Sequence, residues 1–136
     1  MATTISARLN ESTDTLLRVA MRADAVLSGL TGIGLLIFAP QVVEISGTTP
    51  SVEYTIGASF VVFSAVVLAL AARPAVRGSG LVLALGNALF TVATIAVVVI
   101  GVWPLTTVGI ALTLGTGVYT LVMAELQYQG VRRIPK

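Results

Sequence analysis

The sequence predicts an all-α fold: a four-helix transmembrane bundle with a short N-terminal amphipathic helix at the membrane interface. Three observations carry this prediction. Of the 136 residues, 56% are hydrophobic and only 10% are charged, which is too little charge to cover the surface of a soluble domain. Four apolar segments follow one another along the chain. Once these are counted as spans, the basic residues all fall on one side of the membrane. Residues 1–136 are therefore expected to form a single integral membrane domain.

The N-terminal segment, residues 1–22, is expected at the cytoplasmic interface. Asp14, Arg18 and Arg22 recur at intervals of four residues, so they share one face of a helix. Apolar side chains occupy the other face: Leu16, Leu17, Ala20 and Met21. This pattern predicts an amphipathic helix that lies at the interface and leads into the first span.

The first span is predicted at about residues 23–39. Its uninterrupted apolar run begins only at Ala25, so it is shorter than the about 20 residues that a helix needs to cross the hydrocarbon core. The span therefore has to include the ionisable residue Asp24. Pro40 is expected to end the span, because proline does not continue a helix. A loop is expected over residues 40–53.

The other three spans are predicted at about residues 54–72, 81–102 and 105–126. The apolar stretch from Leu81 to Ala124 is too long for one crossing. Trp103 and Pro104 divide it, since proline suits the first turn of a helix but not its interior. Residues 127–136 are then expected to form a cytoplasmic tail.

Charge placement tests this topology independently. With four spans, all eight basic residues fall on one side of the membrane: Arg8, Arg18, Arg22, Arg73, Arg77, Arg132, Arg133 and Lys136. Because Lys and Arg accumulate in cytoplasmic segments, we predict a multi-pass protein of the bacterial plasma membrane with both termini in the cytoplasm. A three-span alternative, with the first segment outside the bilayer, leaves this sorting unexplained unless that segment is re-entrant. A cleaved signal peptide is the alternative for the first segment, but no small-x-small cleavage site follows it.

The first and third predicted spans carry matching polar stripes. Side chains recur at i, i+4 and i+7 in both: Asp24, Ser28 and Thr31, then Asn87, Thr91 and Thr94. Each set lies on one helical face, which predicts that Asp24 and Asn87 form an intramembrane polar pair. Either the stripes hold the bundle together by hydrogen bonds, or they form a path for a proton, an ion or a headgroup. The repeated spacing also favours two parallel helical-hairpin repeats. The alternative is convergence of two amphipathic spans.

The fourth predicted span has a face of small residues. Its members are Gly109, Thr113, Thr116, Gly117, Thr120 and Ala124. Small faces let helix backbones approach closely within a membrane. This face is expected to pack against the first or second span of the same chain, or to dock on a helix of another protein.

The composition excludes several kinds of chemistry. The sequence has no Cys and no His, which rules out thiol nucleophiles, imidazole bases and Cys/His metal sites. No Gly-Lys-Ser/Thr phosphate loop occurs. The acidic residues are few and unpaired. We therefore expect no enzyme activity, no catalytic, cofactor-binding or metal-binding residues and no cofactor. The basic residues are read as setting membrane orientation, so no nucleic-acid partner is expected.

Two short motifs carry a resemblance to a known group. The segments Asp24–Gly29 (DAVLSG) and Gly86–Phe90 (GNALF), together with the span count, resemble small uncharacterised four-span integral membrane proteins of actinobacteria. The resemblance covers most of residues 18–133. It implies an accessory subunit of an envelope complex, such as an Mce-type lipid importer, and it supplies no catalytic residues.

Two functions are therefore expected from the sequence. The first is a non-enzymatic accessory or structural subunit of a larger membrane complex, with lipid transport as one such role. Membrane lipids and membrane-protein subunits would be its partners. The alternative is a small oligomeric transporter of lipid-like or cationic substrates, which the polar stripes and the repeat favour.

Overall fold

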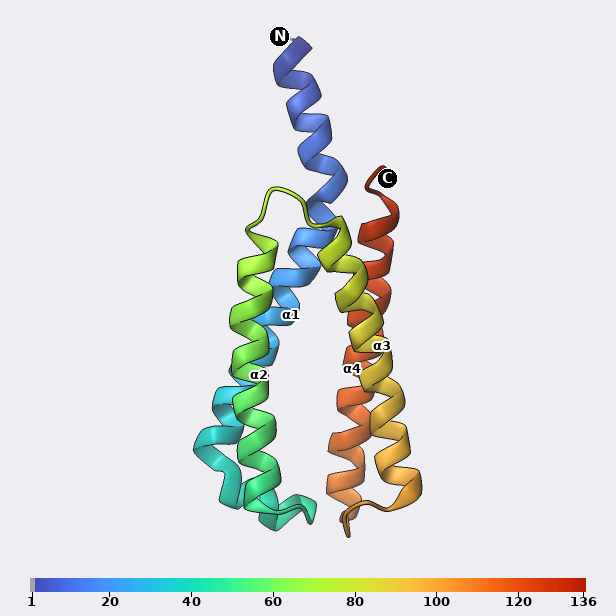
Figure 1. Cartoon of the computed structure of the whole chain (residues 1–136). Coiled ribbons are helices and arrows are strands. Elements are labelled where there is room, and N and C mark those ends of the chain that lie inside the picture. The colour runs from blue at the N-terminus through green and yellow to red at the C-terminus, as the bar shows by residue number, and fades with distance from the viewer. Residues whose placement is uncertain (1) are drawn as a thin grey trace.

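The computed structural model describes the backbone of residues 2–136 and the side chains of residues 13–136. It contains four helices: α1 (Ala2–Ser46), α2 (Pro50–Ala71), α3 (Arg77–Ile100) and α4 (Thr107–Arg132) (Figure 1). No strand occurs within residues 2–136. All four helices, with α1 counted from Thr13, are long and apolar enough to cross a membrane. The predicted all-α four-helix transmembrane bundle is confirmed, and the fold is consistent with a multi-pass membrane protein.

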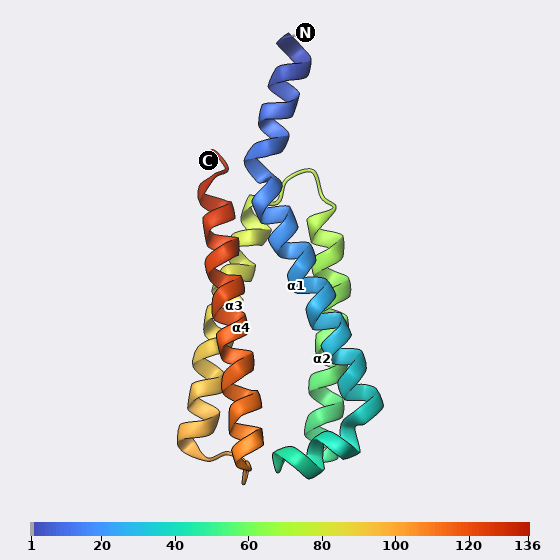
Figure 2. The same cartoon turned by 180° about the vertical axis from the view of Figure 1, so that it is seen from behind.

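The helices pair as two hairpins, α1 with α2 and α3 with α4 (Figures 1 and 2). In the first hairpin the backbones nearly touch, because a Cβ on Gly32 would lie 2.6 Å from the carbonyl oxygen of Gly57. In the second hairpin, Gly117 on α4 lies directly against the Thr94 hydroxyl on α3, and a Cβ at this position would collide with that hydroxyl. Such close approach supplies the van der Waals contact on which helix association in lipid depends.

Both chain termini lie at the same end of the molecule as the connection between α2 and α3 (Figure 1). We call this the basic end, because Arg73, Arg77, Arg132 and Arg133 all lie at helix termini or connections there. The opposite end, which holds the α1–α2 and α3–α4 connections, is called the far end. The arrangement matches the one-sided charge sorting, and the cytoplasmic placement of the basic end stays a prediction.

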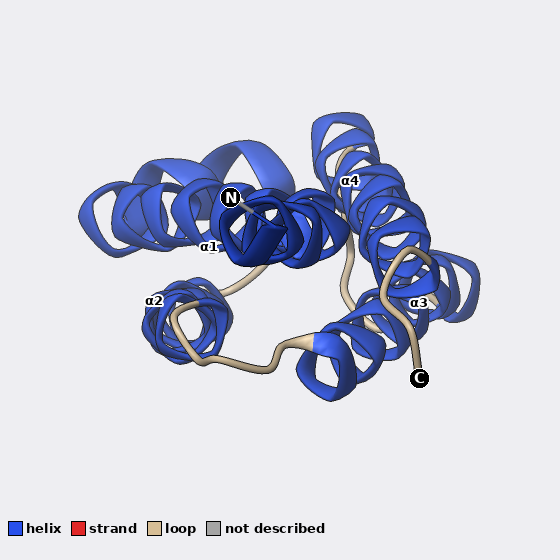
Figure 3. Ribbon diagram, turned by 90° about the horizontal axis from the view of Figure 1, so that it is seen from above, coloured by secondary structure: helices blue, strands red, loops and turns tan. Residues whose placement is uncertain are grey.

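Helix α1 joins the two hairpins at both ends. At the basic end, the fully buried Leu17 packs so closely against α4 that a Cβ on Gly130 would lie 2.7 Å from its Cα. At the far end, the backbone amide of Thr106 donates to the carbonyl of Ser46 at 3.0 Å. We call these contacts the basic joint and the far joint. Helix α2 makes no comparable interface with α3 or α4 (Figure 3).

A break in helical geometry falls where the first span was expected to end, near Pro40, but the chain stays helical beyond it, so the predicted loop is wrong. Helix α1 bends at Phe38, whose φ of −111° and ψ of 20° are not helical, and then continues through Pro40 to Ser46. Proline removes one hydrogen bond and clashes with the carbonyl four residues earlier, which kinks a helix without always ending it. The predicted loop over residues 40–53 shrinks to residues 47–49. The kink turns the last segment of α1 toward the start of α4 (Figure 2).

The amphipathic segment runs into the first span without a break, as expected, since α1 is continuous there. Other boundaries differ from the prediction. Helix α3 begins at Arg77, and α4 begins after its cap Thr106, whose hydroxyl accepts from the Gly109 amide at 3.0 Å. A threonine cap thus sets the start of α4 in place of a proline in its first turn. Because α4 ends only at Arg132, most of the predicted tail belongs to the bundle.

Candidate functional site

A buried carboxylate lies where α1, α3 and α4 meet. Asp24 on α1 is only 1% exposed, and its two oxygens accept four hydrogen bonds. Oδ2 accepts from Asn87 Nδ2 and from Gln127 Nε2, both at 2.9 Å. Oδ1 accepts from the Tyr119 hydroxyl at 2.8 Å and from the Ser28 hydroxyl at 3.2 Å. We call these five residues the Asp24 network; within it, Asn87 Nδ2 also donates to Gln127 Oε1 at 2.9 Å.

The structure brings the predicted pair, Asp24 and Asn87, into direct contact. The sequence analysis missed Gln127, which falls at the start of the predicted cytoplasmic tail but is fully buried. The error came from ending the fourth span too early. A signal was present, because Gln127 follows Thr120 by seven residues and so shares its helical face. Tyr119 was missed as well.

The network contains no cation. Within residues 13–136 the one ion pair joins Arg18 to Asp14 at 2.9 Å, and the nearest basic residue to Asp24 along the chain, Arg22, is exposed. Removing an ionised carboxylate from water is expensive when no charge compensates it. Hydrogen bonds from neutral donors offset part of this cost. An ionised Asp24 would therefore place one negative charge inside the bundle, balanced only by dipoles.

A cavity of about 860 Å³ lies between the two hairpins, with all four helices in its walls. Three members of the Asp24 network, Ser28, Asn87 and Tyr119, line it and form a polar end together with Thr120. The remaining walls are mostly apolar and aromatic, with Leu27, Phe60, Phe63, Val82, Leu83, Phe90, Ala111 and Leu112. The hydroxyls of Thr31, Ser59 and Thr116 also line them, and each donates to a carbonyl of its own helix. The cavity is thus amphipathic: most of its wall is apolar, and one end offers hydrogen-bonding groups.

An aromatic contact crosses the side of the cavity between α2 and α3. The ring centroids of Phe60 on α2 and Phe90 on α3 lie 6.2 Å apart, with the ring planes tilted by 56°. This falls in the range of favourable aromatic pairs. Both rings line the cavity. Because α2 and α3 share no extended interface, this pair bridges a side of the bundle that is otherwise loosely closed.

The polar stripe of α3 packs against the small-residue face of α4. The hydroxyls of Thr91 and Thr120 lie 2.7 Å apart, and Thr91 also donates to the Gly117 carbonyl at 3.0 Å. Thr94 is buried against Gly117. The stripe of α1 behaves differently, since Thr31 is exposed and donates to the Leu27 carbonyl of its own helix. Asp24 bonds to α3 and α4, whereas the Ser28 hydroxyl donates to Asp24 on α1 itself.

The small-residue face of α4 was expected to pack against the first or second span, and this expectation is wrong in one respect. Its middle, around Gly117 and Thr120, is covered by α3 rather than by the first or second span. Its beginning, at Gly109, touches the Ser46 backbone at the end of α1. Thr113 and Thr116 donate to carbonyls of α4 itself, and Ala124 is buried. This chain's own helices therefore cover Gly109, Gly117 and Thr120, while Thr116 lines the cavity between the hairpins.

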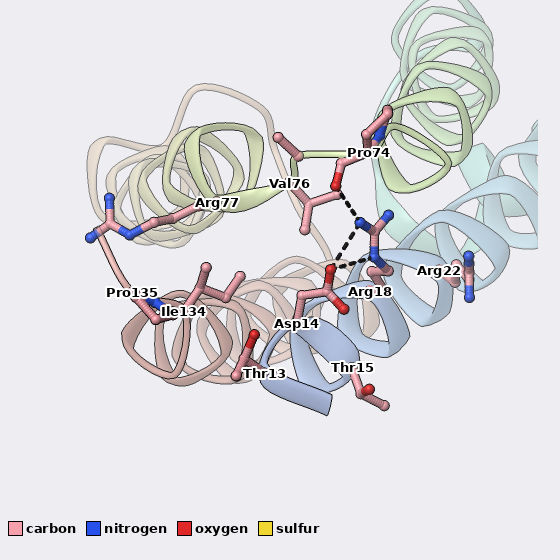
Figure 4. Close-up of a pocket in the computed structure, with 11 residues that line it drawn as sticks. Thr13, Asp14, Thr15, Arg18, Arg22, Pro74, Val76, Arg77, Ile134 and Pro135 are labelled. Atoms are coloured by element: carbon pink, nitrogen blue, oxygen red, sulfur yellow. Dashed lines mark hydrogen bonds and ion pairs between the residues drawn. The ribbon is translucent and has the colours of Figure 1, made fainter. Parts of the chain in front are cut away.

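A second cavity, of about 820 Å³, lies at the basic end (Figure 4). Arg18 lines it, but its guanidinium is occupied. It donates to the carbonyls of Ala71, Arg73 and Pro74 at 2.8, 2.6 and 2.9 Å, in addition to its pair with Asp14. These bonds satisfy carbonyls that the end of α2 would leave without partners. The residue therefore fastens the α2–α3 connection to α1.

In the described part of the chain, Asp and Glu do not gather in groups of three that could hold a metal ion. Comparison with known proteins returned no match, whether to family models, to curated proteins or to solved structures. The Asp24 network and the cavity beside it are therefore the features that bear on function.

Proposed function

We propose that the protein is a small, non-enzymatic transporter of lipid-like cations, with the cavity between the hairpins as its substrate site. The observation that supports this proposal is the combination of apolar walls with a polar end backed by a buried carboxylate that has no cationic partner. An amphipathic cation would complement both parts. Its apolar body would lie against Phe60, Phe63 and Phe90, and its positive group would lie at Tyr119.

Electrostatics favours a positive ligand over a neutral or negative one. The Tyr119 hydroxyl lies 2.8 Å from Asp24 Oδ1, so a cation in contact with that hydroxyl would sit roughly 6 Å from the carboxylate. At an effective dielectric constant of about 20, two opposite unit charges at this separation attract by about 3 kcal/mol. An anion at the same place would be repelled by a similar amount.

The cavity also suits a ligand that partitions into the bilayer. Its volume of about 860 Å³ lies within the range of about 300–1,000 Å³ that small-molecule sites occupy. It is bounded by four helices that are each apolar enough to lie in lipid. The side between α2 and α3 is bridged by the pair Phe60 and Phe90. Entry from the hydrocarbon region would therefore require little rearrangement of packed helices.

The accessory-subunit hypothesis stands second. It is favoured by the short connections between helices, which leave almost no soluble segment. Its strongest sequence support was the small-residue face of α4 as a docking surface. Because that face packs against α3 and the end of α1, an assembly with other subunits would have to use a different surface.

Counterflow in proteoliposomes tests the transport proposal. Vesicles containing the full chain and preloaded with unlabelled tetraphenylphosphonium should take up the labelled cation, whereas vesicles without protein should not. Asp24→Asn should abolish this protein-dependent uptake, because it removes the attracting charge. Tyr128→Phe is the matched control, because Tyr128 is 46% exposed and does not line the cavity. This variant should retain the uptake of the unchanged protein. Absence of counterflow with the unchanged protein would contradict the proposal.

A further inference from the structure

The hydroxyl groups along the walls of the cavity between the hairpins have already used their hydrogens. Thr31, Ser59 and Thr116 each donate to the carbonyl four residues earlier in their own helix, at 2.7–2.8 Å. Thr120 forms a chain with Thr91, in which one hydroxyl donates to the other and the second donates to a carbonyl of α4. A hydroxyl that donates its one hydrogen keeps lone pairs that can accept. These walls therefore offer acceptors and no donors.

The polar end of the cavity follows the same pattern. The hydroxyls of Ser28 and Tyr119 both donate to Asp24 Oδ1. The two Nδ2 hydrogens of Asn87 go to Asp24 Oδ2 and to Gln127 Oε1. The hydrogen bonds that Asp24 accepts favour a carboxylate, which has no hydrogen to offer in return. Asn87 Oδ1 accepts nothing from residues 13–136 and remains accessible beside the cavity.

The backbone around the cavity adds no donor either. Only the first four amide groups of a helix lack an acceptor within that helix. The lining residues nearest to a helix start are Ala111 in α4, which begins at Thr107, and Val82 in α3, which begins at Arg77. Both lie beyond the fourth position of their helices. A ligand in this cavity therefore meets oxygen lone pairs but no hydrogen that it could accept.

We propose that the polar end selects protonated amines, whose N–H groups donate to these oxygens, over cations that carry no N–H group. This inference rests on the proposed function and specifies its substrate class, an amphipathic primary ammonium. The oxygens of Ser28 and Tyr119 lie 3.2 and 2.8 Å from the same Asp24 oxygen, so one nitrogen can reach both at about 3 Å. Asn87 Oδ1 supplies a third acceptor. The three acceptors match the three donors of a primary ammonium group.

The aromatic walls favour the opposite order of affinity. Quaternary ammonium groups bind well against aromatic faces, and three phenylalanine rings line this cavity, those of Phe60, Phe63 and Phe90. Each methyl group added to the nitrogen also gains apolar contact. If these contacts dominated, methylation would strengthen binding. If hydrogen bonds to the polar end dominate, each methyl group removes a donor and weakens it, so the direction of the trend separates the two.

Competition with the counterflow of labelled tetraphenylphosphonium in proteoliposomes tests the inference. The competitors are dodecylamine and its mono-, di- and trimethylated forms, which are all cations at about pH 7. Inhibition should weaken with each methyl group. The concentration that halves uptake should be at least about tenfold higher for the trimethylated form than for the primary amine. Equal or stronger inhibition by the trimethylated form would overturn the selection and leave the proposed function standing. Absence of counterflow with the unchanged protein would overturn both.

Three variants locate the selection. Tyr119→Phe removes an acceptor oxygen but keeps the ring and the charge of Asp24, so the preference for the primary amine should fall by about threefold or more. Tyr128→Phe makes the same chemical change outside the cavity and should keep the full preference. Ser28→Ala should also lower the preference, and it decides the test if Tyr119→Phe does not fold. In both cavity variants, inhibition by the trimethylated form should stay unchanged. A preference that survives in both of them would overturn the assignment to the polar end.

Discussion

The two joints between the hairpins are built in different ways. The basic joint is made of side chains: Leu17 is fully buried between α3 and α4, and the Asp24 network lies about two to three turns further along α1. The far joint is made largely of backbone contacts. The Thr106 amide donates to the Ser46 carbonyl, and Gly109 packs against the Ser46 backbone. A joint with buried side chains resists separation through packing and desolvation together. A few backbone hydrogen bonds resist it much less, so the basic end should be the firm end of the molecule.

The largest expected effect comes from Gly130→Val at the basic joint. A Cβ at this position would lie 2.7 Å from the Cα of Leu17, so α1 and α4 would have to move apart. We expect a loss of several kcal/mol in the free energy of unfolding, at or above the usual about 1–3 kcal/mol of overpacking. Thermal unfolding in detergent measures it. Gly34→Val is the control, because nothing lies within 4 Å of a Cβ there; equal melting temperatures for the two variants would refute close packing at this joint.

The next effect comes from Asp24→Ala, which removes the acceptor that four donors share. The amides of Asn87 and Gln127 would be left short of partners inside the bundle. Leaving a buried polar group unsatisfied costs about 1–3 kcal/mol, so the unfolding free energy should fall by about 2–4 kcal/mol. The same melting assay should show a smaller loss for Asp24→Asn, whose amide oxygen still accepts. Equal losses for the two substitutions would mean that the hydrogen bonds contribute little.

A smaller effect on stability is expected from Gly109→Val at the far joint. A Cβ there would collide with the Ser46 backbone, but the kinked end of α1 can shift without disturbing the Asp24 network. The melting temperature should therefore drop by less than for Gly130→Val. Spin labels at Thr48 and Leu105 should report a wider separation of the hairpins at this end. If Gly109→Val unfolds the protein as completely as Gly130→Val, the two joints are equally strong and the contrast is wrong.

The last prediction concerns orientation and should leave stability unchanged. The sequence has no cysteine, so single substitutions can be labelled cleanly. Ser51→Cys at the far end and Arg133→Cys at the basic end are both exposed positions. In sealed inverted vesicles, an impermeant maleimide should label Arg133→Cys and spare Ser51→Cys, since basic segments face the cytoplasm. The reverse pattern would place the basic end outside the cell.

The sequence predicted the contacts that depend on spacing within a helix. Asp24 and Asn87 could be paired because each opens a stripe with the same intervals and lies at the same depth. The partners contributed by α4 could not be placed, because their depth depends on where that helix ends. Pro40 was misread for a related reason: a proline marks a distortion, and only packing of the following segment decides whether the helix resumes. The small face of α4 indicated that a backbone comes close, but small residues carry no information about which helix approaches.

The pair Phe60 and Phe90 has a kinetic consequence. An aromatic contact of this kind contributes about 0.5–1.5 kcal/mol, which is comparable to the thermal energy of about 0.6 kcal/mol. Because it bridges the side of the cavity between α2 and α3, which share no extended interface, that side should separate and close again many times while the joints stay intact. A molecule in the cavity would then exchange with the surrounding lipid rapidly. Its residence time would be set by two phenyl rings rather than by movement of whole helices.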